Sequence, residues 1–157
     1  MPLSKGLFDE KIMVLGLEAS DVNDALKKLS TRLYEEGYAK ESFIQAVQDR
    51  EKEFPTGLPT EGVGVAIPHT DVIHVNKEAV AVAVLKNPVT FQMMGMPEVN
   101  VSTEILFMLA LKEPHGQIEM LEKLMGVLQD TDLLFAIKES QSIYELKELL
   151  INKFNLE

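Results

Sequence analysis

The chain has 157 residues, 46% of them hydrophobic and 25% charged, which is the balance of a globular protein of ordinary domain size. Its 25 acidic and 15 basic residues give a net charge of −10, and a surface of that sign repels the phosphate backbone of nucleic acids. The absence of cysteine excludes disulfides, thiolate metal sites and a cysteine nucleophile.

The apolar runs of the chain are too short for a transmembrane helix. The longest, 79–85 and 105–111, fall far below the ~20 residues that cross a bilayer as a helix. The N-terminal segment lacks the basic and apolar regions of a secretory signal. We therefore expect a cytoplasmic protein without direct membrane insertion, and, because no repeat or linker interrupts the sequence, a single domain over 1–157.

The first part of the chain is expected to form a strand and an amphipathic helix. Residues 12–17 have the pattern of a first strand. Ser20 stands where an N-cap is expected, and Gly37 stands where a helix stops. Apolar side chains between them recur at helical spacing, namely Val22, Ala25, Leu26, Leu29 and Leu33.

A second helix is predicted over 42–53, ending before Pro55. Its apolar side chains and one arginine recur at helical spacing, namely Phe43, Val47, Arg50 and Phe54. This spacing predicts that Arg50 lies in the apolar stripe of the helix.

The remaining chain is predicted to hold four strands followed by three helices. The expected strands are 63–67, 79–85, 90–94 and 105–111, with a turn at 95–97. The expected helices are one with Ile118, Leu121, Leu124 and Leu128 at helical spacing, a short one capped near Asp130 or Thr131, and one opened by the capping box Ser142-x-x-Glu145. Because helices both precede and follow the strands, we predict an α/β fold whose sheet is covered on both faces.

The segment most informative about function is 62–71, Gly-Val-Gly-Val-Ala-Ile-Pro-His-Thr-Asp. An apolar strand stops there at Pro68, and the next residue, His69, presents an imidazole that can attack a phosphoryl donor or bind a metal. As a nucleophile, a neutral imidazole can hold a phosphoryl group and release it again. The alternative interpretation is a structural histidine bonded to a backbone carbonyl at a strand end.

With Thr-Gly-Leu-Pro at 56–59, this segment resembles the active-site segment of the fructose/mannitol-type enzyme IIA of the bacterial sugar phosphotransferase system (PTS), and Val-Ile-His-Val at 72–75 is most similar to the galactitol branch. The resemblance implies a mixed sheet of about five strands. The resemblance also implies that Nε2 of His69 accepts a phosphoryl group from HPr and passes this group to a cysteine of enzyme IIB. Through enzyme IIB, the protein would serve the membrane enzyme IIC. Such a phosphocarrier of sugar or sugar-alcohol uptake needs no metal or organic cofactor.

Two residues near this segment are further candidates. The resembled family places an arginine on the helix before the Thr-Gly-Leu-Pro motif, and Arg50 matches it, which implies charge stabilisation during transfer. Without the resemblance, Arg50 is equally an arginine at the rim of the core, paired with Glu53 or Glu61. Thr56 is either a contact of the phosphate or a turn residue.

A second imidazole is expected at the start of the helix that follows the sheet. His115 stands just after a proline at this helix N-terminus, where negative charge is favoured, and it could donate a hydrogen bond to the phosphoryl group. The sequence departs from mannitol-type members here, because Gln117 occupies the position of their second histidine. Either residue could assist His69.

Two other functions compete with the phosphocarrier. A regulatory enzyme IIA of the nitrogen-related branch would use phosphorylation of the same histidine to change its partners. A metal-dependent hydrolase would use the cluster of His69, Asp71 and His74, completed by His115. The hydrolase lacks a His-Glu-x-x-His motif, and in an extended segment His69 and His74 would point to opposite faces.

Overall fold

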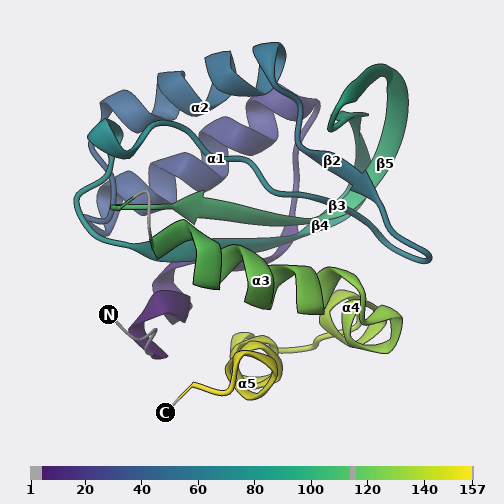
Figure 1. Ribbon diagram of the computed structural model, residues 1–157. Coiled ribbons are helices and arrows are strands. Elements are labelled where there is room, and N and C mark those ends of the chain that lie inside the picture. Colours follow the sequence, from purple (N-terminus) through teal and green to yellow (C-terminus); the bar gives the residue numbers. More distant parts are fainter. Residues whose placement is uncertain (1–4, 114–115, 157) are drawn as a thin grey trace.

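A mixed five-stranded sheet forms the middle of the protein, as the computed structural model describes it for residues 5–113 and 116–156 (Figure 1). The strand order is β1-β4-β2-β3-β5, and β4 also pairs with β5. The strands are β1 (Met13–Leu17), β2 (Gly57–Pro59), β3 (Gly64–Ala66), β4 (Ala79–Met93) and β5 (Met96–Ala110). Parallel and antiparallel pairs both occur, so the predicted mixed sheet of about five strands is confirmed.

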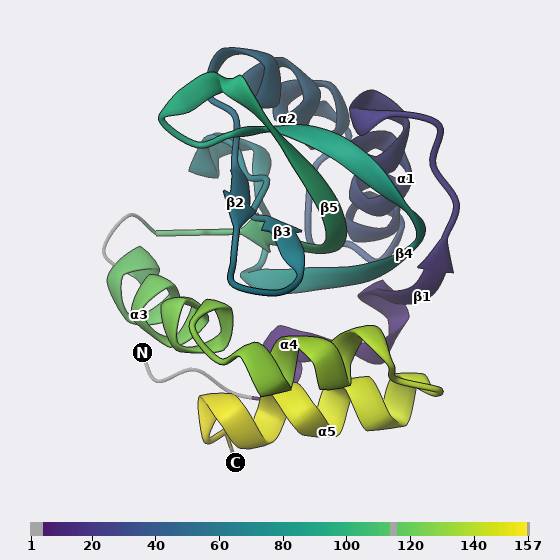
Figure 2. The same ribbon diagram turned by 90° about the vertical axis from the view of Figure 1, so that its right-hand side faces the viewer.

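Helices cover both faces of this sheet, as the sequence predicts (Figures 1 and 2). One layer consists of α1 (Val22–Glu35) and α2 (Ser42–Glu53), and the other consists of α3 (Gly116–Leu128), α4 (Thr131–Lys138) and α5 (Ile143–Phe154). Three short 3-10 helices complete the described elements: η1 (Lys5–Phe8), η2 (Glu10–Ile12) and η3 (Val72–His74). No helix within the described residues is long and apolar enough to span a bilayer.

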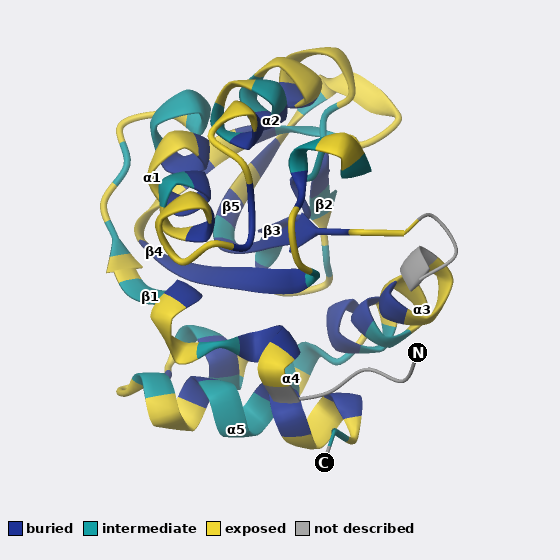
Figure 3. Cartoon of the chain, turned by 90° about the vertical axis from the view of Figure 1, so that its left-hand side faces the viewer, coloured by how far each residue is buried: buried dark blue, intermediate teal, exposed yellow. Residues whose placement is uncertain are grey.

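The two faces of β4 carry side chains of different size. Ala79, Ala81 and Ala83 belong to the core cluster that α1 and α2 close, and the valines between them belong to the cluster on the other face. Successive side chains of a strand point to opposite faces, so this alternation divides one strand between two cores. The small alanine side chains let the first helical layer approach the sheet closely. Figure 3 shows the buried first part of β4, residues 79–85, beneath helices whose outer turns are exposed.

The region predicted as two strands, 79–85 and 90–94, is the single strand β4. The pairing register with β5 shifts between Val84 and Val89, so the strand changes its alignment where the sequence suggested a break. The predicted turn after it is present at Gly95, whose φ of 78° lies in the left-handed region that glycine adopts without strain.

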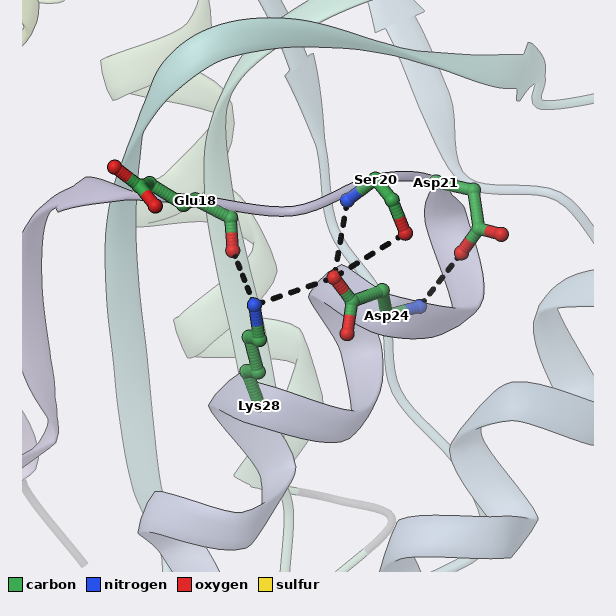
Figure 4. A network of polar contacts seen from close by, with 5 residues as sticks. All are labelled: Glu18, Ser20, Asp21, Asp24 and Lys28. Carbon is green, nitrogen blue, oxygen red and sulfur yellow. Dashed lines mark hydrogen bonds and ion pairs between the residues drawn. The ribbon is translucent and has the colours of Figure 1, made fainter.

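The N-cap of α1 is Asp21 rather than the predicted Ser20. The Asp21 carboxylate accepts a hydrogen bond from the backbone N–H of Asp24 (2.8 Å). The Asp24 carboxylate in turn accepts from the Ser20 backbone N–H (3.0 Å) and pairs with Lys28 (3.2 Å), as Figure 4 shows. Ser20 therefore takes part in the reciprocal capping of α1 through its backbone N–H, as the residue just before the N-cap.

The caps of α4 and α5 are those predicted. Asp130 accepts from the Leu133 N–H (3.0 Å), and Ser142 accepts from the Glu145 N–H (3.1 Å). The predicted stripe of α3 is wrong in part, because Ile118 and Leu121 are exposed. From Ile118 onward, the buried side chains of this helix are Met120, Leu124, Val127 and Leu128.

Candidate functional site

His69 lies where the chain leaves β3 and runs beside the end of β5. Ile67 and Pro68 before it are buried, and the Pro68 carbonyl accepts a hydrogen bond from the Leu109 N–H (2.9 Å). His69 itself forms a parallel bridge with Leu109. Proline restricts its own backbone and lacks an N–H, so Pro68 contributes only its carbonyl to the pairing with β5. The backbone that carries His69 is therefore held against β5.

The imidazole of His69 is half-buried, and its Nδ1 lies 2.9 Å from the Ile67 carbonyl oxygen. A carbonyl oxygen only accepts hydrogen bonds, so this contact requires the proton on Nδ1. The neutral ring then keeps its lone pair on Nε2. A bond to a backbone carbonyl is what a purely structural histidine would make, but here the same bond directs the ring for a chemical role.

Arg50 lies in the last turn of α2, but it is exposed instead of lying in the apolar stripe. Its Cζ atom sits 4.5 Å from the centroid of the Phe54 ring, which is itself exposed. Within the described residues, no ion pair or hydrogen bond joins Arg50 to Glu53, Glu61 or His69. The guanidinium is held by its aromatic neighbour, with its donors available to an anion.

Glu51 is the residue that sequence reasoning missed at this position. It is 6% exposed, and its carboxylate accepts two hydrogen bonds from Thr56, one from the backbone N–H and one from the hydroxyl, both 2.7 Å. The chain turns back at Phe54 and Pro55, so it covers the Glu51 side of the helix and leaves the Arg50 side open. The sequence signal for Glu51 is its place four positions after Val47, which puts both residues on one face of α2.

Thr56 takes no part in contacting a phosphate through its hydroxyl, because that hydroxyl donates to Glu51 and the residue is 2% exposed. Its backbone instead connects α2 to the histidine segment. The Thr56 carbonyl accepts a hydrogen bond from the Ile67 N–H (3.2 Å). Glu51, Thr56, Ile67 and His69 therefore form a continuous chain of hydrogen bonds.

Burial raises the pKa of Glu51 to about 7, and the two hydrogen bonds from Thr56 oppose that rise. The folded protein thus binds a proton more readily than the unfolded chain, and this group's contribution to stability is fully present below pH ~4.5 and is lost as pH rises through about 7. The loss is on the order of 3 kcal/mol, since one pKa unit corresponds to about 1.4 kcal/mol.

We expect Glu51→Gln to remove this pH dependence, because the amide stays neutral and can keep both contacts with Thr56. Urea unfolding of both proteins between pH 4.5 and 8 measures the difference. The comparison is needed because burial also raises the pKa of Glu78, which contributes in the same direction in both proteins. Parallel stability curves for the two proteins would contradict the assignment.

The second candidate imidazole, His115, lies outside the described residues. Gln117 belongs to the first turn of α3, which begins at Gly116. His74 has a different hydrogen-bond partner from His69: its Nδ1 contacts the hydroxyl of Ser42 (2.8 Å), at the start of α2. In the described part of the chain, no three His, Asp or Glu side chains are grouped to hold a metal ion.

The chain is similar to known proteins in both sequence and fold. The family model described as "Phosphoenolpyruvate-dependent sugar phosphotransferase system, EIIA 2" matches residues 6–153. The PTS system galactitol-specific EIIA component of Escherichia coli K12 is 30% identical over 129 residues, which cover 80% of this chain and 85% of that protein.

Two solved structures share the fold. The crystal structure of IIA mannitol from Escherichia coli superposes with a TM-score of 0.74 at 26% identity, covering 90% of this chain and 97% of that one. The complex of enzyme IIAMTL and phosphorylated enzyme IIBMTL, also from Escherichia coli, gives 0.73 at 24% identity, covering 91% of this chain and 95% of the matched one. The predicted mannitol-type fold is therefore confirmed.

Proposed function

We propose that His69 carries the phosphoryl group in this chain, which belongs to the EIIA 2 family of the phosphoenolpyruvate-dependent sugar phosphotransferase system. The predicted family resemblance is thereby confirmed. Components of this family transfer phosphate. The observation that supports His69 is its bond from Nδ1 to the Ile67 carbonyl, because this bond leaves Nε2 as the nucleophilic atom of a neutral ring.

In the proposed transfer, the Nε2 lone pair attacks the phosphorus atom of phosphorylated HPr. The bond between phosphorus and the donor atom breaks as the new bond to Nε2 forms, and its electron pair returns to HPr. The proton on Nδ1 stays in the bond to Ile67 throughout. In the second step, a thiolate of enzyme IIB attacks the same phosphorus, and the electron pair of the broken bond returns to Nε2.

Arg50 is proposed to stabilise the charge on the phosphoryl oxygens during both steps. It is exposed and carries no anionic partner within the described residues, so a guanidinium is available at the last turn of the helix that connects to the His69 segment. Either His115 or Gln117 is proposed to donate a further hydrogen bond.

We expect Arg50→Ala to slow phosphoryl transfer from HPr roughly 100-fold, the usual cost of removing one preorganised donor of transition-state charge. Rapid-quench measurement of labelled protein checks this. Lys52→Ala is the matched control, because Lys52 is an exposed cation in the same helical turn. Equal rates for the two variants would contradict a role for Arg50.

Both proposed partners need an exposed, partly apolar surface near the imidazole. Phe54 at the end of α2 and Ile73 in η3, four residues after His69, are such side chains, being 51% and 64% exposed. Exposed aromatic and aliphatic side chains are typical of transient interfaces. Because the chain is similar to the galactitol-specific component, we propose that it serves the uptake of a galactitol-like sugar alcohol.

The test is to incubate the protein with phosphoenolpyruvate, enzyme I and HPr, and to measure its mass and map the modified peptide. An acid-labile phosphate on the peptide that contains His69 is expected. Its loss upon addition of a cognate enzyme IIB supports transport. Retention of the phosphate with every cognate IIB would favour the regulatory alternative, and a protein that takes no label would overturn the proposal.

A further inference from the structure

The hydrogen-bond chain from α2 to the imidazole begins at a buried carboxyl group that the proposed transfer does not use. Pro55 has no N–H, so the Thr56 N–H is the first donor after the helix turns back. That donor is buried and needs an acceptor, because an unpaired buried N–H is costly. The Glu51 carboxylate supplies it at 2.7 Å and accepts the Thr56 hydroxyl with its other oxygen. Both carboxylate oxygens of Glu51 are therefore bonded to the same residue, Thr56.

Thr56 passes this constraint to the histidine segment. Its carbonyl accepts the Ile67 N–H (3.2 Å), and the Ile67 carbonyl faces His69 Nδ1 (2.9 Å). One peptide further on, the Pro68 carbonyl is held by Leu109 of β5 (2.9 Å). Two separate elements thus fix the backbone on either side of the Ile67 carbonyl: β5 holds the Pro68 carbonyl, and α2 holds the Ile67 N–H through Glu51 and Thr56.

We infer that Glu51 is a positioning residue for phosphoryl transfer, which orients the Ile67 carbonyl through Thr56 and thereby keeps the His69 proton on Nδ1 and the lone pair on Nε2. This inference rests on the proposed function of His69 as the acceptor. Glu51 does not touch the imidazole or the phosphoryl group. Its effect is on the orientation and tautomer of the ring that does.

The contact persists whether or not Glu51 is ionised. Burial raises the pKa of Glu51 to about 7, so both forms are present near neutral pH. In the neutral form the carboxyl O–H can donate to the Thr56 hydroxyl while the other oxygen still accepts the Thr56 N–H. A glutamine has the same set of donors and acceptors, so Glu51→Gln should keep His69 in place.

The test compares Glu51→Ala and Glu51→Gln with Val47→Ala. Val47 lies one turn earlier on the same buried face of α2, so its truncation loosens the core without touching the hydrogen-bond chain. Long-range 15N–1H correlation spectra of the unphosphorylated proteins report the tautomer of His69, and initial rates with phosphorylated HPr give kcat and KM.

For Glu51→Ala we expect a mixture of His69 tautomers in place of the Nδ1–H form, and a kcat about tenfold lower with KM unchanged, because a misplaced nucleophile slows the chemical step. Glu51→Gln and Val47→Ala should keep the Nδ1–H tautomer and stay within about twofold of the wild-type kcat. If Glu51→Ala fails to fold, Glu51→Asp replaces it. Its side chain is too short to reach both the N–H and the hydroxyl of Thr56, so we expect the tautomer and kcat to change in the same direction.

The inference is overturned if the alanine or aspartate variant keeps the wild-type tautomer and kcat, or if Val47→Ala changes them as much. The tautomer is read without phosphate, so it is independent of the proposed function. If the wild-type protein takes no phosphate, the transfer role of His69 is refuted. If Glu51→Ala nevertheless loses the Nδ1–H tautomer, the positioning of the His69 ring by Glu51 is still supported.

Discussion

Replacing His69 by glutamine is expected to abolish phosphorylation of the protein by phosphorylated HPr. The amide N–H of glutamine can still donate to the Ile67 carbonyl, which His69 Nδ1 faces at 2.9 Å, so the local fold should persist. An amide nitrogen has no basic lone pair, so it cannot form the bond to phosphorus. The variant should therefore fold like the wild type and carry no acid-labile phosphate.

His74→Gln is the matched control for this experiment. His74 lies five positions further along the same segment, and its Nδ1 contacts the Ser42 hydroxyl instead of the strand that precedes His69. Mass spectra after incubation with the phosphoryl donors should show full labelling of His74→Gln and none of His69→Gln. Labelling of the His69 variant, or loss of labelling in the His74 variant, would contradict the proposed acceptor.

Substituting Gly64 by alanine is expected to cause the largest loss of stability among single-methyl changes near the site. A Cβ atom at Gly64 would lie 1.9 Å from the Ser102 carbonyl oxygen and 2.8 Å from its carbon. Both atoms belong to the backbone of β5, so no side-chain rotation relieves the clash. We expect a loss of about 3 kcal/mol, the upper part of the range for overpacked sites.

Gly126→Ala provides the control, because in the described part of the chain its added Cβ would meet Lys153 Cε at 3.8 Å, which is an ordinary contact. This position lies inside α3, where alanine is more favourable than glycine by roughly 0.5–1 kcal/mol. Urea midpoints at constant slope should therefore move in opposite directions for the two variants. Because β3 leads directly to His69, Gly64→Ala should also slow phosphoryl transfer, and a variant as stable and active as the wild type would contradict the close strand contact.

Local patterns predicted most of the elements because they depend on neighbouring residues. Helix α2 has the predicted bounds, Ser42–Glu53, since a proline two residues later ends it. The caps at Asp130 and Ser142 are also local, as each side chain bonds an N–H three residues ahead. The cap of α1 was misplaced by one residue because Ser20 and Asp21 both have capping side chains.

Errors arose where packing between distant segments decided the outcome. The spacing of α2 favoured Arg50 as its inward residue, but the chain that turns back after Pro55 covers Glu51 instead. The separate strand predicted over 90–94 is continuous with the preceding one because β5 pairs along both. Helical periodicity records which residues share a face, but it does not show which part of that face a neighbouring segment covers.

The sequence by itself determined the α/β fold class, the segment that presents His69 and the family to which it belongs, because these depend on short-range periodicity and on one contiguous motif. The tertiary structure alone decided that the ring bonds through Nδ1 and that Glu51 anchors the path to it. Those contacts join α2, the β2 segment and the end of β3, and hydrogen bonds between separate elements form only once the whole sheet has placed them within reach.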